Sequence, residues 1–135
     1  MSLPESVHEN PAITIPMFSI TAHFYLNDVT TELGPTTLIP GSHKAGRPPR
    51  DETTWHGMAP QAAIVRAGDV LLFRGDLWHG SGMNSCQTER RYMMQIHYGS
   101  GLVERQYPAM QYESLWSPEV IAQATPEQKQ LLGAR

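Results

Sequence analysis

Hydrophobic and polar residues alternate along much of the chain, which is the pattern of β-strands with one buried face. The longest alternating run covers residues 18–29, and a second run covers residues 91–98. In the first run the polar face carries Ser19, Thr21, His23 and Tyr25. Shorter strands are expected at residues 36–39, 61–66, 70–73 and 77–80. Turns rich in glycine and proline separate these runs, so the pattern predicts a mostly-β sandwich or barrel.

Two segments depart from this pattern. Residues 44–60 carry few apolar positions and predict a long surface loop, a kind of segment that often acts as a lid. In the tail, Ser117-Pro118 and Thr125-Pro126 each place a capping side chain before a proline, which predicts two helix starts. We therefore expect one domain over residues 1–135, with strands over 8–98 and a C-terminal extension with helices over 99–135.

The composition narrows the classes of function. The net charge is −3 and the basic residues are scattered, which argues against a nucleic-acid-binding protein. No apolar run approaches the roughly 18 residues that a membrane span needs. The single cysteine, Cys86, excludes an internal disulfide and fits a reducing compartment, so we expect a cytoplasmic protein.

The most informative stretch runs from residue 69 to residue 91. His79 follows an apolar strand, and Gly80 and Gly82 leave space around its ring. Histidine can hold a divalent metal. Arg90, eleven positions later, carries the side chain best suited to bind a carboxylate through two parallel hydrogen bonds. Together they predict a metal site beside a carboxylate-bearing cosubstrate. The alternative interpretation is a packed strand-end histidine and a surface arginine.

Two further polar residues are expected to face this site. Neighbouring residues of a strand point to opposite faces, so Arg91 should face outward if Arg90 faces the site. Ser81 lies two residues beyond His79 and could donate a second hydrogen bond to a bound carboxylate, unless it only stabilises a turn. His23 looks into the site if the polar face of its run lines the interior, and it faces solvent if not.

A non-haem iron site commonly uses two histidines and one carboxylate. We expect the second histidine and the carboxylate in one short H-x-D or H-x-E segment upstream of His79. The upstream segment with suitable spacing is His8-Glu9-Asn10, which offers an amide in place of the carboxylate. An amide oxygen can coordinate a hard cation, although it carries no charge. The alternatives are a solvated histidine in a polar loop and an asparagine that begins a turn before proline.

Three motifs occur together and in order. They are Pro40-Gly41-Ser42-His43 within residues 26–44, Gly68-Asp69 within residues 67–73, and the stretch from His79 through Asn84 to Arg90. With these motifs the chain resembles the phytanoyl-CoA dioxygenase family of Fe(II)- and 2-oxoglutarate-dependent oxygenases. The similarity covers about residues 8–98. Family members are usually longer, so we expect this chain to correspond to the C-terminal portion of such an oxygenase.

The resemblance implies a double-stranded β-helix, or jelly roll, which would be incomplete here. It implies that His79 is the distal iron ligand, and that Arg90 and Ser81 bind the far carboxylate of 2-oxoglutarate. By position, His8 matches the first ligand and Asn10 the carboxylate. His23 matches a residue near the cosubstrate.

The implied reaction is hydroxylation of an unknown small molecule, coupled to decarboxylation of 2-oxoglutarate. The alternative is a jelly-roll module without catalysis, which binds a small ligand or forms a homodimer through exposed sheet edges.

Overall fold

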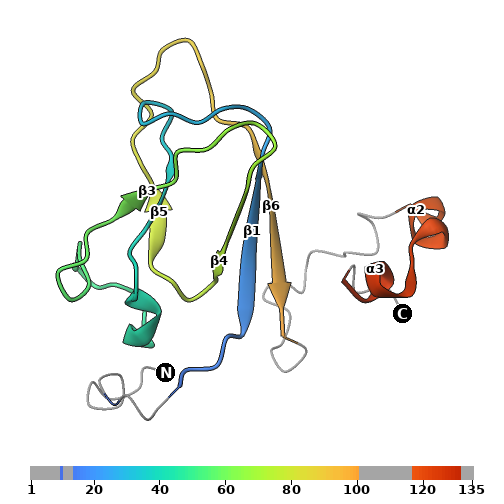
Figure 1. Ribbon diagram of the computed structural model, residues 1–135, viewed down its shortest axis with the longest axis horizontal. Coiled ribbons are helices and arrows are strands. Elements are labelled where there is room, and N and C mark those ends of the chain that lie inside the picture. The colour runs from blue at the N-terminus through green and yellow to red at the C-terminus, as the bar shows by residue number, and fades with distance from the viewer. Residues whose placement is uncertain (1–9, 11–13, 101–116, 132–135) are drawn as a thin grey trace. The chain divides into compact units, whose positions relative to one another are not determined.

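The computed structural model describes residues 10, 14–100 and 117–131. The chain divides into two compact units, residues 1–100 and residues 101–135. All strands of the described residues lie in the first unit, and both described α-helices lie in the second (Figure 1). This confirms the predicted mostly-β class, while the organisation as one domain stays a prediction.

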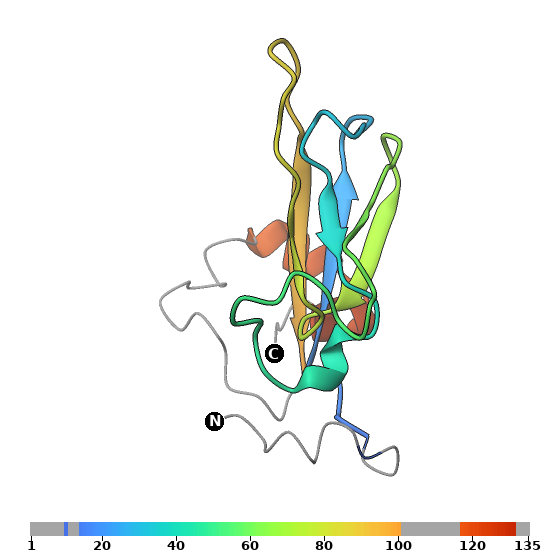
Figure 2. The same cartoon turned by 90° about the vertical axis from the view of Figure 1, so that its left-hand side faces the viewer.

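The longer strands form one antiparallel sheet. Strand β1 (Ser19–Tyr25) lies between β4 (Val70–Arg74) and β6 (Met93–Gly99). The turned view in Figure 2 shows the long connection between residues 82 and 92 extending well beyond the strands before the chain enters β6. This sheet therefore pairs β1, the first strand of the unit, with β6, its last strand.

The shorter strands form the second antiparallel sheet. Strand β2 (Thr36–Leu38) lies between β3 (Gln61–Ala62) and β5 (His79–Ser81). The strand expected over residues 61–66 is shorter than predicted, because after β3 only Val65 pairs again, in an isolated bridge with Val29. His79, the predicted metal ligand, is the first residue of β5.

The register of β1 decides which side chains face the second sheet. β1 pairs with β6 so that Thr21 lies opposite His97 and Tyr25 lies opposite Met93. Thr21, His23 and Tyr25 are all buried. Because residues two apart in a strand share a face, the odd-numbered residues of β1 and β6 lie on the same side of the sheet, and those of β1 are the more buried. The polar face of the run at residues 18–29 is thus the inner one.

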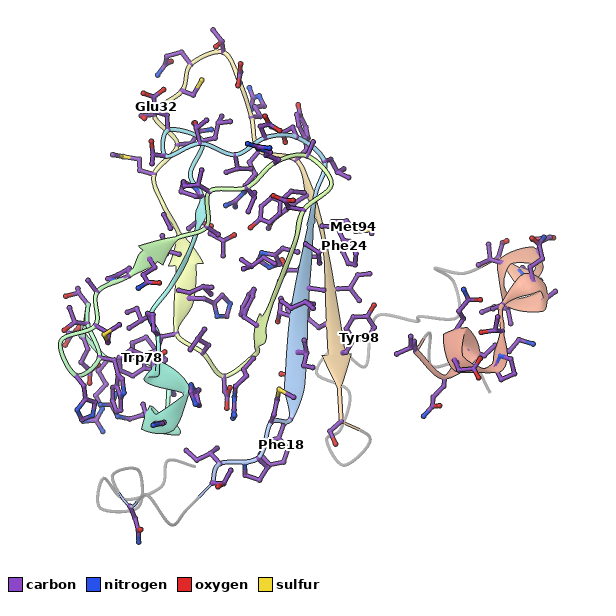
Figure 3. All side chains as sticks on the ribbon, viewed as in Figure 1. Phe18, Phe24, Glu32, Trp78, Met94 and Tyr98 are labelled. Atoms are coloured by element: carbon purple, nitrogen blue, oxygen red, sulfur yellow. The ribbon has the colours of Figure 1, made fainter. Side chains whose placement is uncertain are left out.

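The opposite face of this sheet is apolar and partly open to solvent. Leu72 of β4 is 64% exposed and Met94 of β6 is 51% exposed. Figure 3 shows Phe24, Met94 and Tyr98 on the side of their strands that faces away from the second sheet. Several large apolar side chains of these strands therefore lie on the outer face of the sheet.

Two small apolar clusters support the unit instead. Tyr25, Val29 and Leu33 form the first cluster, where β1 ends. Ile39, Ala45 and Trp78 form the second, close to the start of β5. Full burial of an apolar side chain stabilises a protein by about 1.5–3 kcal/mol. The strands that carry the site are therefore held mainly at their ends.

The segment predicted as a loop contains local order. It begins with the 3-10 helix η1 (Ser42–Ala45) and contains a tight hairpin in which Trp55 and Met58 pair. The two residues at the hairpin tip both have positive φ, 45° at His56 and 78° at Gly57. This backbone shape suits a two-residue hairpin turn.

The tail contains the two helices whose starts the sequence predicted. They are α2 (Pro118–Gln123) and α3 (Pro126–Leu131). The Ser117 hydroxyl accepts from the Val120 N–H, and the Thr125 hydroxyl accepts from the Gln128 N–H. Both predicted caps are thus confirmed. Within the described part of the chain, no helix has the length and apolar character that a bilayer crossing requires.

The turn before β2 has room only for glycine at position 34. Gly34 has a φ of +62°, and a Cβ atom there would lie 2.8 Å from the Gly82 carbonyl oxygen and 3.3 Å from the Asn84 nitrogen. Since residues 82–84 directly follow β5, this close approach fixes the end of the strand that carries His79.

We predict that Gly34→Ala destabilises the protein by more than the roughly 1–2 kcal/mol that a left-handed backbone costs an L-residue. The reason is the added clash with the Gly82 carbonyl. Gly57→Ala is the matched control, because Gly57 also has a positive φ but nothing within 4 Å of its Cβ position. Chemical denaturation measures both losses. Equal losses would contradict the assignment.

Candidate functional site

Both backbone polar groups of Trp78, the residue before His79, are hydrogen-bonded. The Trp78 N–H donates to the Ser42 hydroxyl over 2.8 Å, and the Trp78 carbonyl accepts from the Ile39 N–H over 2.9 Å. Ser42 is fully buried, and Gly41 before it has a φ of 81°. The Pro-Gly-Ser-His motif therefore acts structurally, because it supplies the hydroxyl that holds the strand leading into His79.

The ring of His79 has a defined orientation. Its Nδ1 lies 2.7 Å from the Leu77 carbonyl oxygen. A carbonyl only accepts, so Nδ1 carries the proton and Nε2 keeps a lone pair. Metal-binding histidines almost always donate their second ring N–H in this way. The side chain is exposed, and the local geometry of His79 therefore fits a metal ligand.

His23 lies on the inner face of β1, between the two sheets. Its ring makes an edge-to-face contact with Phe73 at a centroid distance of 5.1 Å, and Phe73 in turn contacts the ring of His79 at 5.0 Å. The side chain of His23 is 3% exposed, and its Nε2 has no hydrogen-bond partner among the described residues. Of the two interpretations of His23, the interior one is correct.

The charge state of His23 follows from its surroundings. Burial lowers its pKa below the usual value, and the nearby basic side chains of His79, Arg91 and His97 lower the pKa further. A histidine with a lowered pKa is neutral at physiological pH. His23 therefore contributes a neutral polar group to the interior rather than a cation.

The structure reverses the expected orientation of the two arginines. One guanidinium N–H of Arg91 donates to the Ser81 hydroxyl over 3.2 Å, and another donates to the Gly34 carbonyl. Arg90 is exposed and lines a shallow surface pocket. Arg91 rather than Arg90 therefore lies beside Ser81, opposite to the expected orientation, while a role of Arg90 in cosubstrate binding stays a prediction.

The side chain of Asn27, just after the end of β1, explains the orientation of the two arginines. The Asn27 amide oxygen accepts from the Tyr92 N–H, and its amide nitrogen donates to the Arg90 carbonyl. Asn27 thus extends the pairing of β1 and β6 by one step beyond Tyr25 and Met93. Because Met93 faces inward, Arg91 shares its face and Arg90 does not.

Two polar residues of β6 lie on the same side of the sheet as Thr21, although both are exposed, and the sequence interpretation missed them. His97 Nδ1 lies 2.9 Å from the Thr21 hydroxyl, and His97 Nε2 lies 2.7 Å from the Gln95 side-chain amide. The available signal was their position: Gln95 and His97 are the polar residues of the alternating run at 91–98. The register between β1 and β6 places Gln95 and His97 opposite His23 and Thr21, on the same side of the sheet.

The structure does not show the other two predicted metal ligands, His8 and Asn10, beside His79. Asn10 is exposed, and His8 lies outside the described residues. Within residues 10, 14–100 and 117–131, no three histidine, cysteine or acidic side chains gather as a metal site. The roles of His8 and Asn10 stay predictions.

Comparison with known proteins shows which family the chain resembles. A family model described as phytanoyl-CoA dioxygenase (PhyH) matches residues 5–92. Dioxygenase trt7 of Aspergillus terreus is 31% identical over an alignment of 126 residues, and the match covers 90% of this chain and 40% of that protein. Dioxygenase cdmD of Talaromyces verruculosus is 32% identical over an alignment of 127 residues, and the match covers 89% of this chain and 37% of that protein.

Solved structures of HygX from Streptomyces hygroscopicus are similar in fold. The structure with iron bound is 30% identical with a TM-score of 0.51, and the match covers 62% of this chain and 38% of that chain. The structure with nickel, 2-oxoglutarate and hygromycin B bound is 30% identical with a TM-score of 0.52, and the match covers 62% and 36%. This likeness confirms the expected jelly-roll class.

The chain spans 40% or less of the length of the two dioxygenases. The family model matches residues 5–92 of this chain, a range that includes the motifs around Ser42 and His79. The resemblance predicted from the sequence is confirmed, and the chain belongs to the phytanoyl-CoA dioxygenase family.

Proposed function

We propose that this chain is the Fe(II)- and 2-oxoglutarate-binding part of an oxygenase that hydroxylates a small molecule. The observation that carries the proposal is the pairing of Arg91 with Ser81, two residues from His79 on one strand face. The HygX structures that hold iron, or nickel with 2-oxoglutarate, support the choice of metal and cosubstrate. The single cysteine supports a cytoplasmic location.

The spacing on β5 suits a dicarboxylate. Residues two apart in a strand share a face and lie about 7 Å apart, a span comparable with an extended five-carbon diacid. Arg91 and Ser81 would bind the far carboxylate, with Arg91 taking the role that the sequence assigned to Arg90. His79 would bind the metal through Nε2, and His8 and Asn10 would complete the ligand set.

The residues around this face have separate tasks. When bound, iron and 2-oxoglutarate would supply the oxidising chemistry. Phe73 packs between the rings of His23 and His79 and so keeps bulk water from the space between them. The Leu77 carbonyl holds the His79 ring so that Nε2 stays available. The protein thus contributes orientation and a partly dry interior.

The segment 44–60 is suited to cover a substrate. The ring of Trp55 lies 5.3 Å from the ring of Trp78, the residue next to His79. Arg47 lies over the Trp78 ring at 5.5 Å and pairs with Glu52, which lowers the pKa of that carboxyl to about 2. These contacts hold the segment beside the start of β5, where a substrate would approach the metal.

A second candidate is a jelly-roll module that self-associates without catalysis. Two observations favour it: Asn10 stands where the family has a carboxylate, and the outer face of β4, β1 and β6 exposes large apolar residues. β4 and β6 also form the two edges of that sheet. A homodimer would cover this face or pair these edges.

We predict that Arg91→Ala weakens the binding of 2-oxoglutarate by about 1.5–3 kcal/mol, the usual contribution of hydrogen bonds to a charged group. Calorimetric titration with Fe(II) under anaerobic conditions measures the dissociation constant. Arg90→Ala is the matched control and should stay within about twofold of the wild type, because Arg90 is exposed. A larger loss in Arg90→Ala than in Arg91→Ala would contradict the assignment.

We predict that His79→Ala abolishes Fe(II) binding and the weak visible charge-transfer band that Fe(II) and 2-oxoglutarate should produce together. His56→Ala removes an exposed histidine at the hairpin tip and should leave both signals unchanged. Asn10→Asp should tighten Fe(II) binding roughly tenfold or more, about 1.4 kcal/mol, because a carboxylate adds charge to the ligand set. Unchanged iron affinity in His79→Ala would contradict the metal site.

The second candidate predicts a dimer at micromolar concentration that Leu72→Ser with Met94→Ser converts to a monomer. Light scattering coupled to size exclusion measures the mass of both proteins. Val120→Ser, which alters an exposed apolar residue of α2, is the control and should leave the mass unchanged. A monomeric wild type would exclude self-association through this face.

A further inference from the structure

The chain ahead of β1 is bound by the side chain of Arg74, the last residue of β4. The Nη2 group of Arg74 donates to the Ile15 carbonyl over 3.1 Å and to the Pro16 carbonyl over 3.5 Å. Antiparallel pairing sets Arg74 opposite Ile20, so the end of β4 and the start of β1 lie at the same end of the sheet (Figure 1). A side chain, rather than strand pairing, therefore attaches residues 15 and 16 to the sheet.

The direction of the Arg74 guanidinium is fixed by Asp76. Nε of Arg74 donates to Oδ1 of Asp76 over 2.9 Å, and Nη2 donates to Oδ2 over 2.7 Å. These bonds lower the pKa of the Asp76 carboxyl below its usual value, so the pair stays charged at physiological pH. A partly exposed ion pair adds little to stability, but two parallel bonds fix a geometry. We call this pair the Arg74–Asp76 clamp.

The turn that carries the clamp also contacts His79. The Leu77 N–H donates to the Arg74 carbonyl over 3.1 Å and closes the turn, and the Leu77 carbonyl lies 2.7 Å from Nδ1 of His79. On the other side, the Gly75 N–H donates to the Ser19 carbonyl over 3.0 Å. A Cβ atom at Gly75 would overlap the Ser19 hydroxyl. One turn thus contacts both the chain around the start of β1 and the ring of His79.

The clamp shortens the tether of the other two predicted ligands. Asn10 lies nine positions before Ser19, the first residue of β1, but five positions before Ile15. The effective concentration of a tethered group falls with roughly the −3/2 power of the tether length. Fixing Ile15 therefore raises the local concentration of the residues ahead of it, close to the turn that orients His79.

We propose that Arg74 and Asp76 are positioning residues of the metal site, which hold the chain carrying His8 and Asn10 against the turn that leads into His79. They act through the Ile15 and Pro16 carbonyls and do not bind the metal themselves. The role of His8 and Asn10 as ligands rests on the proposed function. The clamp is a property of the protein without metal, so the two parts can fail separately.

The first measurement is the mobility of residue 14 in the metal-free protein. A nitroxide label on Thr14→Cys, in a protein that also carries Cys86→Ser, reports this mobility through its EPR line shape. Arg74→Met should narrow the lines, because the Ile15 carbonyl loses its donor. Asp76→Asn should narrow them less, because it leaves the guanidinium in place but removes its charged partner.

Arg66→Met is the matched control for this measurement. Arg66 precedes the other end of β4, and its side chain is exposed. The spectrum of Arg66→Met should equal that of the labelled protein without further changes. Unchanged spectra in both Arg74→Met and Asp76→Asn would overturn the clamp, whatever the metal affinity.

The second measurement is the affinity for Fe(II) under anaerobic conditions. Arg74→Met should raise the dissociation constant roughly two- to threefold, the factor expected from the longer tether. Arg66→Met should bind like the wild type. Val29→Ala controls for a general loss of stability, because Val29 is fully buried in the cluster with Tyr25 and Leu33. It should unfold at lower denaturant concentration but keep the wild-type iron affinity.

The outcomes separate the clamp from the proposed function. Equal iron affinity of Arg74→Met and the wild type would overturn the positioning role while leaving the proposed function standing. An equal loss of affinity in Val29→Ala would do the same, because the effect would then follow stability. A wild type that binds no Fe(II) would overturn the proposed function together with the positioning role, even if the label on residue 14 shows the clamp.

Discussion

The antiparallel register between β1 and β6 determines the character of the whole interior. It sets Thr21 opposite His97, and it sets Tyr25 opposite Met93. Each of these residues faces the second sheet, and so does every second residue along both strands. A shift by one residue would replace this polar lining with apolar side chains. The position of the Arg91 guanidinium beside Ser81 depends on the same register.

A polar interior has an energetic consequence. Buried polar groups must be hydrogen-bonded, and here they bond to one another across the strands. Tyr25, Thr36 and His23 form one such buried chain, while the buried Thr21 bonds to the exposed His97, which in turn contacts Gln95. The orphaned Nε2 of His23 is the exception recorded among the described buried side chains.

Much of the fold could be predicted from local patterns. Alternation located the strands, and glycine and proline located the turns. Ser117 and Thr125 marked both helix starts because capping is a local interaction. His79 was found because its motif is local too. The face that each strand turns inward was harder to predict, because the inner face is the polar one. An alternating run shows which residues share a face, but it does not show which of the two faces turns toward the interior.

The arginine assignment shows the limit of counting along the sequence. Spacing from His79 pointed to Arg90, but residues 82–92 form a long connection in which the only strand-like pairing is an isolated bridge between Asn84 and Leu33. The orientation is set instead by the Asn27 side chain, which pairs with the backbone of Arg90 and Tyr92. This is a contact between segments more than sixty residues apart. No local pattern in the sequence reports such a contact.

The most direct measurement of this arrangement is side-chain NMR of the arginines during addition of 2-oxoglutarate to the Zn(II)-loaded protein. Lysine replacements at positions 90 and 91 would assign the two guanidinium signals. We expect the Arg91 signal to shift as the dicarboxylate binds and the Arg90 signal to stay in place. A shift of the Arg90 signal with Arg91 unchanged would contradict the register on which the interior depends.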